Sequence, residues 1–129
     1  MNYYHSKILE GKDFDAVRTE VEAALKEEGF GILTEIDFQA TMKKKLDKDY
    51  LPHVILGACN PTYADKVVSI EPHISTMLPC NVTIREMENG NIEVTAIDPA
   101  TAMAVVDNND LIEHAEEVNE MLKNVLKAL

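Results

Sequence analysis

An apolar stripe near the C-terminus is the feature that most constrains the fold. Its residues recur three or four positions apart, the spacing that places side chains on one face of a helix. They are Leu111, Ala115, Val118, Leu122, Val125 and Leu129. The pattern predicts a helix from about Asn109 to Lys127. Such a helix must bury its stripe against another element, so the rest of the chain has to supply a matching apolar surface.

A second helix is predicted in the first half of the chain. Asp13 has the side chain of a helix N-cap, and Gly29 suits a left-handed C-terminal cap. Between them, apolar residues follow helical spacing: Phe14, Val17, Val21, Ala24 and Leu25. This segment and the C-terminal helix are the two long helices of the predicted fold.

Five segments between and around these helices are predicted to be strands. They are residues 3–9, 30–38, 54–58, 82–87 and 92–96. Asn89-Gly90 is a hairpin signal between the last two, because both residue types tolerate positive φ. Asp98-Pro99 is expected to end the final strand.

Shorter segments complete the predicted order. Asn60 is predicted to cap a short helix with Pro61 at its first position, where the missing N–H costs nothing. Residues 39–47 read as a short helix or turn, and residues 71–79 as an irregular loop. The sequence thus predicts an α+β fold of the order strand, helix, four strands, helix. Its mostly antiparallel five-stranded sheet has the two long helices on one face, with short extra helices.

Length and composition fit one globular unit. The chain has 129 residues, 46% hydrophobic and 27% charged. A chain of this size buries enough surface for a hydrophobic core without disulfide support. No repeat, low-complexity tract or linker interrupts it, so residues 1–129 are predicted to form a single domain.

The charge balance restricts the partners of the chain. The chain has 12 basic and 23 acidic residues, which gives a formal net charge of −11. Nucleic-acid and anionic-membrane binding rely on clustered Lys and Arg, so neither partner is expected. The N-terminus lacks the pattern of a secretory signal and no segment is apolar enough to span a bilayer. We therefore expect a cytoplasmic protein with reduced cysteines.

Two segments have more distinctive sequence motifs than the predicted strands and helices alone would require. One is Leu56-Gly57-Ala58-Cys59-Asn60-Pro61, and the other runs from Glu71-Pro72-His73-Ile74 to Leu78-Pro79-Cys80-Asn81-Val82. With residues 28–33 and Ile97-Asp98-Pro99, they resemble the domain of unknown function 302 (DUF302) family over nearly the whole chain. The resemblance implies a TATA-binding-protein-like fold and a homodimer. The activity and any cofactor are unknown at this stage, since the family name assigns none.

Cys59 and Cys80 are the candidate site. Cys59 ends a predicted buried strand just before a helix start, where the helix dipole favours a thiolate. Cys80 opens the next strand. If the two strands pair antiparallel, both sulfurs come to one edge of the sheet, within the ~7 Å Cα separation of a disulfide.

Three functions follow from that expectation. The cysteines belong to a module that binds a small ligand or a soft metal, to a thiol-dependent redox enzyme, or to a structural or interaction module in which both thiols simply fill space. Asn60 and Asn81, next to the cysteines, are candidate ligand-binding residues, or else a helix cap and a turn residue. His53 and His73 are the candidate further metal ligands; alternatively, His53 packs its ring on the sheet. His5 and His114 are expected at the surface.

Overall fold

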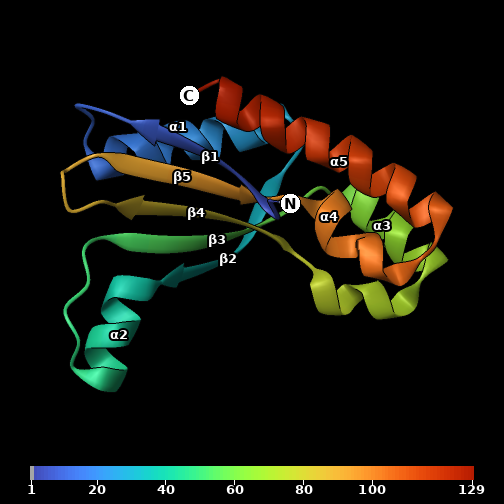
Figure 1. Cartoon of the computed structure of the whole chain (residues 1–129), viewed down its shortest axis with the longest axis horizontal. Coiled ribbons are helices and arrows are strands. Elements are labelled where there is room, and N and C mark those ends of the chain that lie inside the picture. The colour runs from blue at the N-terminus through green and yellow to red at the C-terminus, as the bar shows by residue number, and fades with distance from the viewer. Residues whose placement is uncertain (1) are drawn as a thin grey trace.

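The computed structural model describes residues 2–129, and its centre is a five-stranded antiparallel sheet (Figure 1). The strands are β1 (Tyr4–Leu9), β2 (Gly31–Asp37), β3 (His53–Cys59), β4 (Cys80–Glu86) and β5 (Ile92–Ile97). They lie in the order β1-β5-β4-β3-β2, and every neighbouring pair is antiparallel. The predicted α+β class and sheet are confirmed.

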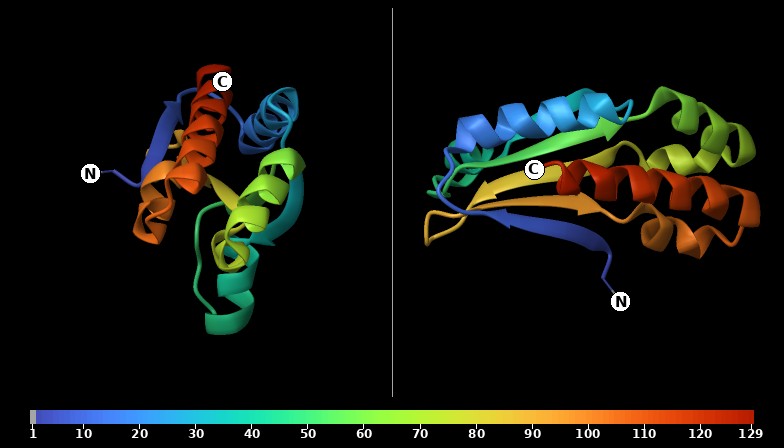
Figure 2. Two further views of the ribbon diagram at one scale, coloured as in Figure 1. Left: turned by 90° about the vertical axis from the view of Figure 1, so that its right-hand side faces the viewer. Right: turned by 90° about the horizontal axis from the view of Figure 1, so that it is seen from above.

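Two long helices, α1 (Phe14–Glu27) and α5 (Asn109–Lys127), cover one face of the sheet, and Figure 2 shows both running along its strands. The Asp13 side chain accepts a hydrogen bond from the N–H of Ala16, which caps α1 as predicted. The bounds predicted for the C-terminal helix match those of α5. The α1 and α5 stripes pack on alternate strand residues such as Leu56, Ile84 and Val94, all with no exposed surface.

A second, smaller core lies beyond one end of the sheet. It joins α3 (Pro61–Ile70), η1 (Pro72–Met77), α4 (Pro99–Met103) and the first half of α5. Its buried residues are Val67, Ile74, Met103, Leu111 and Ala115. The site described below lies where this end core meets the sheet.

Three local predictions need correction. The segment predicted as an irregular loop contains the 3₁₀ helix η1, and the chain after Asp98 forms α4 and η2 (Ala104–Val106), which were not predicted. In both places a Pro at the first helical position follows an acidic cap, Glu71 or Asp98. The signal was therefore present but too short to show helical periodicity.

The third correction concerns the ends of two strands. Phe38 opens α2 (Phe38–Leu46) instead of ending β2, because Asp37 caps the helix through the N–H of Ala40. The β4–β5 hairpin is confirmed, but only Gly90 of the Asn89-Gly90 pair has positive φ. The N–H of Gly90 donates to the carbonyl of Met87, so the turn is wider than two residues.

Among residues 2–129, no helix is both long and apolar enough to cross a membrane.

Candidate functional site

A small cavity of about 30 Å³ lies between the end of the sheet and the end core. Six elements or their flanks supply its walls, and apolar side chains predominate. The lining residues are Phe30, Ala58, Cys59, Asn60, Tyr63, Ala64, Val67, Leu78, Pro79, Cys80, Pro99, Met103, Ala115 and Val118. A cavity of this size has room for a water molecule or the methyl end of a ligand.

Cys59 and Asn60 stand at the entry to α3. Cys59 is the last residue of β3 and is half-buried. Asn60 caps α3, because its side-chain oxygen accepts the N–H of Tyr63 at 3.4 Å. Its Nδ2 also donates to the carbonyl of Glu28 at 3.5 Å, which ties the start of α3 to the end of α1. The predicted capping role of Asn60 is therefore confirmed, and the residue also lines the cavity.

Cys80 is buried at the start of β4, with 8% of its surface exposed. The pKa of its thiol is raised to about 11, mainly by burial and to a smaller extent by the charge of Cys59. The charged form is disfavoured because an apolar surrounding cannot solvate a thiolate. Cys80 is therefore a neutral thiol at physiological pH.

Gly57 and Pro79 bring the two family-like segments into contact. A Cβ atom added at Gly57 would lie 2.6 Å from Cγ of Pro79 and would also overlap the Thr34 hydroxyl. Only glycine leaves room for Pro79, which precedes Cys80, to cross over β3. This packing gives the Gly57 and Pro79 motifs a structural reason.

The expected cysteine pair is wrong. The strands do pair antiparallel, but Cys80 faces Ala58, one residue before Cys59. Because successive side chains of a strand alternate between faces, Ala58 and Cys80 share the helix-covered face and Cys59 has the opposite phase. Both thiols are free and do not lie close together. The geometry thus gives no dithiol that could cycle with a disulfide.

The histidines expected as metal ligands are not brought to the cysteines. His53 begins β3, whereas Cys59 ends it. Its ring lies 4.9 Å from that of Phe38, and burial, followed by the charge of Arg85, lowers its pKa. His73 has a side chain that is 94% exposed and pairs with Glu71. Within the described residues there is no group of three or more His, Cys, Asp or Glu that could hold a metal ion.

Asn81 lies outside the cavity. Its residue is exposed, and in the sheet it faces Gly57. Alternation places its side chain on the face away from the helices, opposite to that of Cys80. A neighbouring position in the sequence was therefore a poor guide to a shared site.

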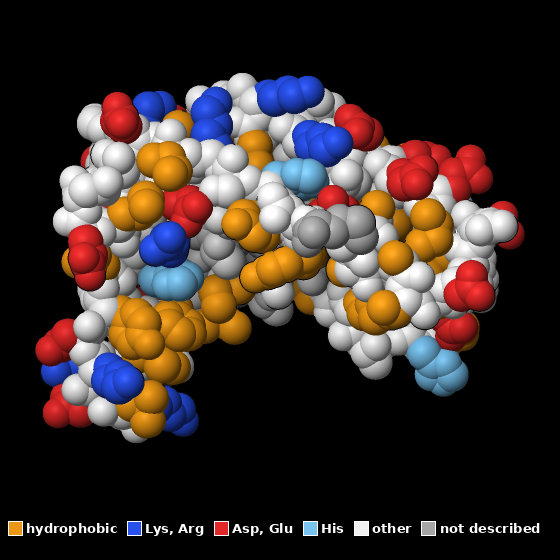
Figure 3. Space-filling view, viewed as in Figure 1, with side chains coloured by type: hydrophobic (Ala, Val, Ile, Leu, Met, Phe, Trp, Pro, Cys, Tyr) orange, Lys and Arg blue, Asp and Glu red, His pale blue; other side chains and the backbone are white. Residues whose placement is uncertain are grey.

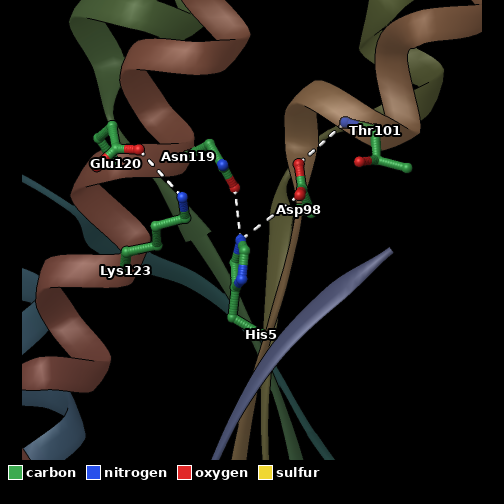
Figure 4. A network of polar contacts seen from close by, with 6 residues as sticks. All are labelled: His5, Asp98, Thr101, Asn119, Glu120 and Lys123. Carbon is green, nitrogen blue, oxygen red and sulfur yellow. Dashed lines mark hydrogen bonds and ion pairs between the residues drawn. The ribbon is translucent and has the colours of Figure 1, made fainter. Parts of the chain in front are cut away.

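A polar network beside β1 was not anticipated from the sequence (Figure 4). Nε2 of His5 lies 2.8 Å from Oδ1 of Asn119 on α5 and 3.6 Å from Oδ2 of Asp98. Both oxygens are acceptors, so Nε2 carries the proton. Asn119 is the polar residue buried within the α5 stripe, with 8% of its surface exposed. His5 is half-buried instead of lying at the surface, because its ring hydrogen-bonds to the buried side-chain amide of Asn119.

His114 also departs from the surface prediction. Its Nδ1 atom is buried with no hydrogen-bond partner in the described part of the chain. The ring packs edge-on against Tyr63, whose hydroxyl donates a short hydrogen bond to Glu117. The sequence could not predict this contact, because His114 lies on α5 and its partner Tyr63 lies on α3.

Comparison with known proteins supports the resemblance. The family model described as "Domain of unknown function DUF302" matches residues 5–129. A crystal structure of an uncharacterized conserved DUF302 protein from Bacillus stearothermophilus is similar in fold, with a TM-score of 0.91 and 23% identity, covering 99% of this chain and 98% of that one. No curated protein matches the chain. The TATA-binding-protein-like fold implied by the resemblance stays a prediction.

Proposed function

Since the chain belongs to the DUF302 family, whose description assigns no activity, we propose from the site itself that it is a non-enzymatic module that binds the apolar end of a small, neutral ligand. The cavity between β3, β4 and the end core carries this proposal. Apolar walls drawn from several elements form a preorganised site, and such sites bind mainly by burying apolar surface.

The chemistry of the cysteines favours such a ligand over a soft metal. Metal binding requires a deprotonated thiolate. Because the pKa of Cys80 is raised to about 11, loss of its proton to a bound metal costs more free energy than it does for an ordinary thiol. A neutral thiol in an apolar wall acts as a small, polarisable packing group, which suits an alkyl or thioether end.

The test is a titration with n-butanol, followed by the methyl NMR signals of Met103 and Val118, which line the cavity. We expect saturable shifts at these methyl groups. Ala64→Leu should fill the cavity and abolish them, whereas Ala23→Leu, on the exposed surface of α1, should leave them unchanged. The proposal would be contradicted if butanol caused no shifts in the wild-type protein. It would also be contradicted if the shifts persisted in folded Ala64→Leu protein.

We also propose that the chain works as a homodimer. The observation that favours this second proposal is an exposed set of large apolar residues on strands at both edges of the sheet, including Ile8 at 50%, Leu33 at 66% and Ile36 at 46% exposure. Light scattering at micromolar protein should give twice the chain mass of 14.4 kDa. The chain mass alone, over the whole accessible concentration range, would refute it.

A further inference from the structure

The face of the sheet opposite α1 and α5 has no helix packed over its centre. Strand alternation and the register identify its residues. They are Tyr4, Ser6 and Ile8 on β1, Glu93, Thr95 and Ile97 on β5, Asn81, Thr83 and Arg85 on β4, His53, Ile55, Gly57 and Cys59 on β3, and Gly31, Thr34 and Ile36 on β2. We call this set the open face. Its hydrogen bonds agree with the assignment, since Ser6 and Arg85 both donate to Glu93 across it.

The open face is electrically neutral on a strongly acidic chain. Arg85 and Glu93 are its only charged residues, with His53 counted as neutral, and they pair with each other at 2.7 Å. The formal charge of the whole chain is −11. The excess acid therefore lies elsewhere, and Figure 3 shows much of it gathered towards the α3–α5 end of the molecule.

An apolar flank continues the open face onto α2. Phe38 packs edge-on against Tyr50, and Leu46, Tyr50 and Leu51 are 61%, 39% and 43% exposed. Figure 3 shows hydrophobic side chains gathered at this flank and the molecule hollowed between α2 and the opposite end. Exposed apolar groups that adjoin one another mark an interaction site.

We propose that a second copy of this chain docks on the open face, with the two sheets face to face about a two-fold axis. This proposal rests on the proposed homodimer and supplies its interface. In a two-fold interface each copy presents the same patch, so a patch of single charge would repel itself. The open face avoids that penalty, because its one ionic pair is internally balanced.

The dimensions of the face fit this occupant. Five strands spaced ~4.8 Å apart, each about six residues long at ~3.3 Å per residue, span roughly 24 by 20 Å. That footprint of about 500 Å² is more than half of the ~800 Å² that each partner buries in a standard interface. The α2 flank supplies further apolar area. Two acidic chains docked this way also keep their charged helical surfaces apart, which lowers the repulsion between them.

Single charges placed on the open face test the interface. Ile8→Glu and Ile36→Glu alter half-exposed residues on the two edge strands, so each should fold normally by circular dichroism. Val105→Glu is the matched control, because Val105 is 79% exposed and lies in η2, outside the open face. The measurement is sedimentation equilibrium of all three variants and the wild-type protein at equal concentrations.

We expect the wild-type protein and Val105→Glu to be dimers, and both isoleucine variants to weaken the dimer at least tenfold. A wild-type dimer that neither isoleucine variant weakens would overturn this interface and leave the homodimer proposal standing. A dimer weakened equally by Val105→Glu would also overturn it, since the effect would then reflect added charge alone. A monomeric wild-type protein would refute both proposals.

Discussion

The two faces of the sheet use the same strands in opposite ways. On the covered face, residues such as Leu56 and Ile84 have no exposed surface and pack under α1 and α5. On the open face their chain neighbours are Ile55, Thr83 and Arg85, which mix one apolar side chain with polar ones. The covered face is therefore a core, whereas the open face has the composition of an interface, which must stay soluble before its partner arrives.

Neighbouring residues on β3 should show the largest difference between the faces. Leu56→Ala should lower the free energy of unfolding by about 3 kcal/mol, because it removes a fully buried side chain and leaves a cavity. Ile55→Ala should cost less than half as much in dilute protein, since Ile55 is only partly buried in one chain. Urea denaturation measures both.

Protein concentration sharpens this comparison. If a second copy covers the open face, the cost of Ile55→Ala rises with concentration, because the dimer stabilises only the folded state. The cost of Leu56→Ala stays constant. Equal costs for the two variants in dilute protein would show that the open face is already buried within one chain.

Alkaline pH should test the covered face at Cys80. The pKa of its thiol rises from 9.0 to about 11 on folding, so burial stabilises the protein fully below pH 9 and less as pH climbs towards 11. Across that window, wild-type protein should lose roughly 2 to 3 kcal/mol more stability than Cys80→Ala, which lacks the titrating thiol.

Cys59→Ala is the control for this titration. It keeps Cys80 and its burial, the larger cause of the shift, so most of the wild-type loss should remain. Parallel stability curves for wild-type and Cys80→Ala protein between pH 8 and 11 would show that Cys80 is not in a low-dielectric environment.

The sequence predicted elements whose signals are local. Asp13 and Asn60 cap helices through residues three positions later, and the α5 stripe needs only its own spacing. The strands and the hairpin could also be read from alternation and turn residues. These features hold whichever elements pack together.

The candidate site failed where it depended on pairing between distant segments. The order of β3 and β4 was correct, but a one-residue offset placed Ala58 opposite Cys80 and separated the thiols. Register is set by packing over whole strands, and a shift of one residue exchanges the faces. The cavity was missed for the same reason, because Pro79, Pro99 and Val118 meet only after the end core has folded.

The smallest expected effect concerns the polar contacts that Ser6 and Arg85 make with Glu93 on the open face. Hydrogen bonds from Ser6, and then from Arg85, lower the pKa of Glu93, so the carboxylate contributes stability above its ordinary range and loses it as pH falls. In the ion pair with Arg85, the arginine side chain is 45% exposed and that of Glu93 is 17% exposed, so solvent screens the pair on the arginine side and its contribution is about 1 kcal/mol or less. Glu93→Gln should therefore cost under about 1 kcal/mol in dilute protein at pH 7, and the difference from wild type should vanish at acidic pH, where both side chains are neutral. Urea denaturation at the two pH values measures this, with Glu20→Gln as the control, because Glu20 forms an exposed ion pair with Lys12 outside the open face. A much larger cost for Glu93→Gln would mean that the open face is held by polar contacts within the chain, and the contrast between a packed face and an interface would fail.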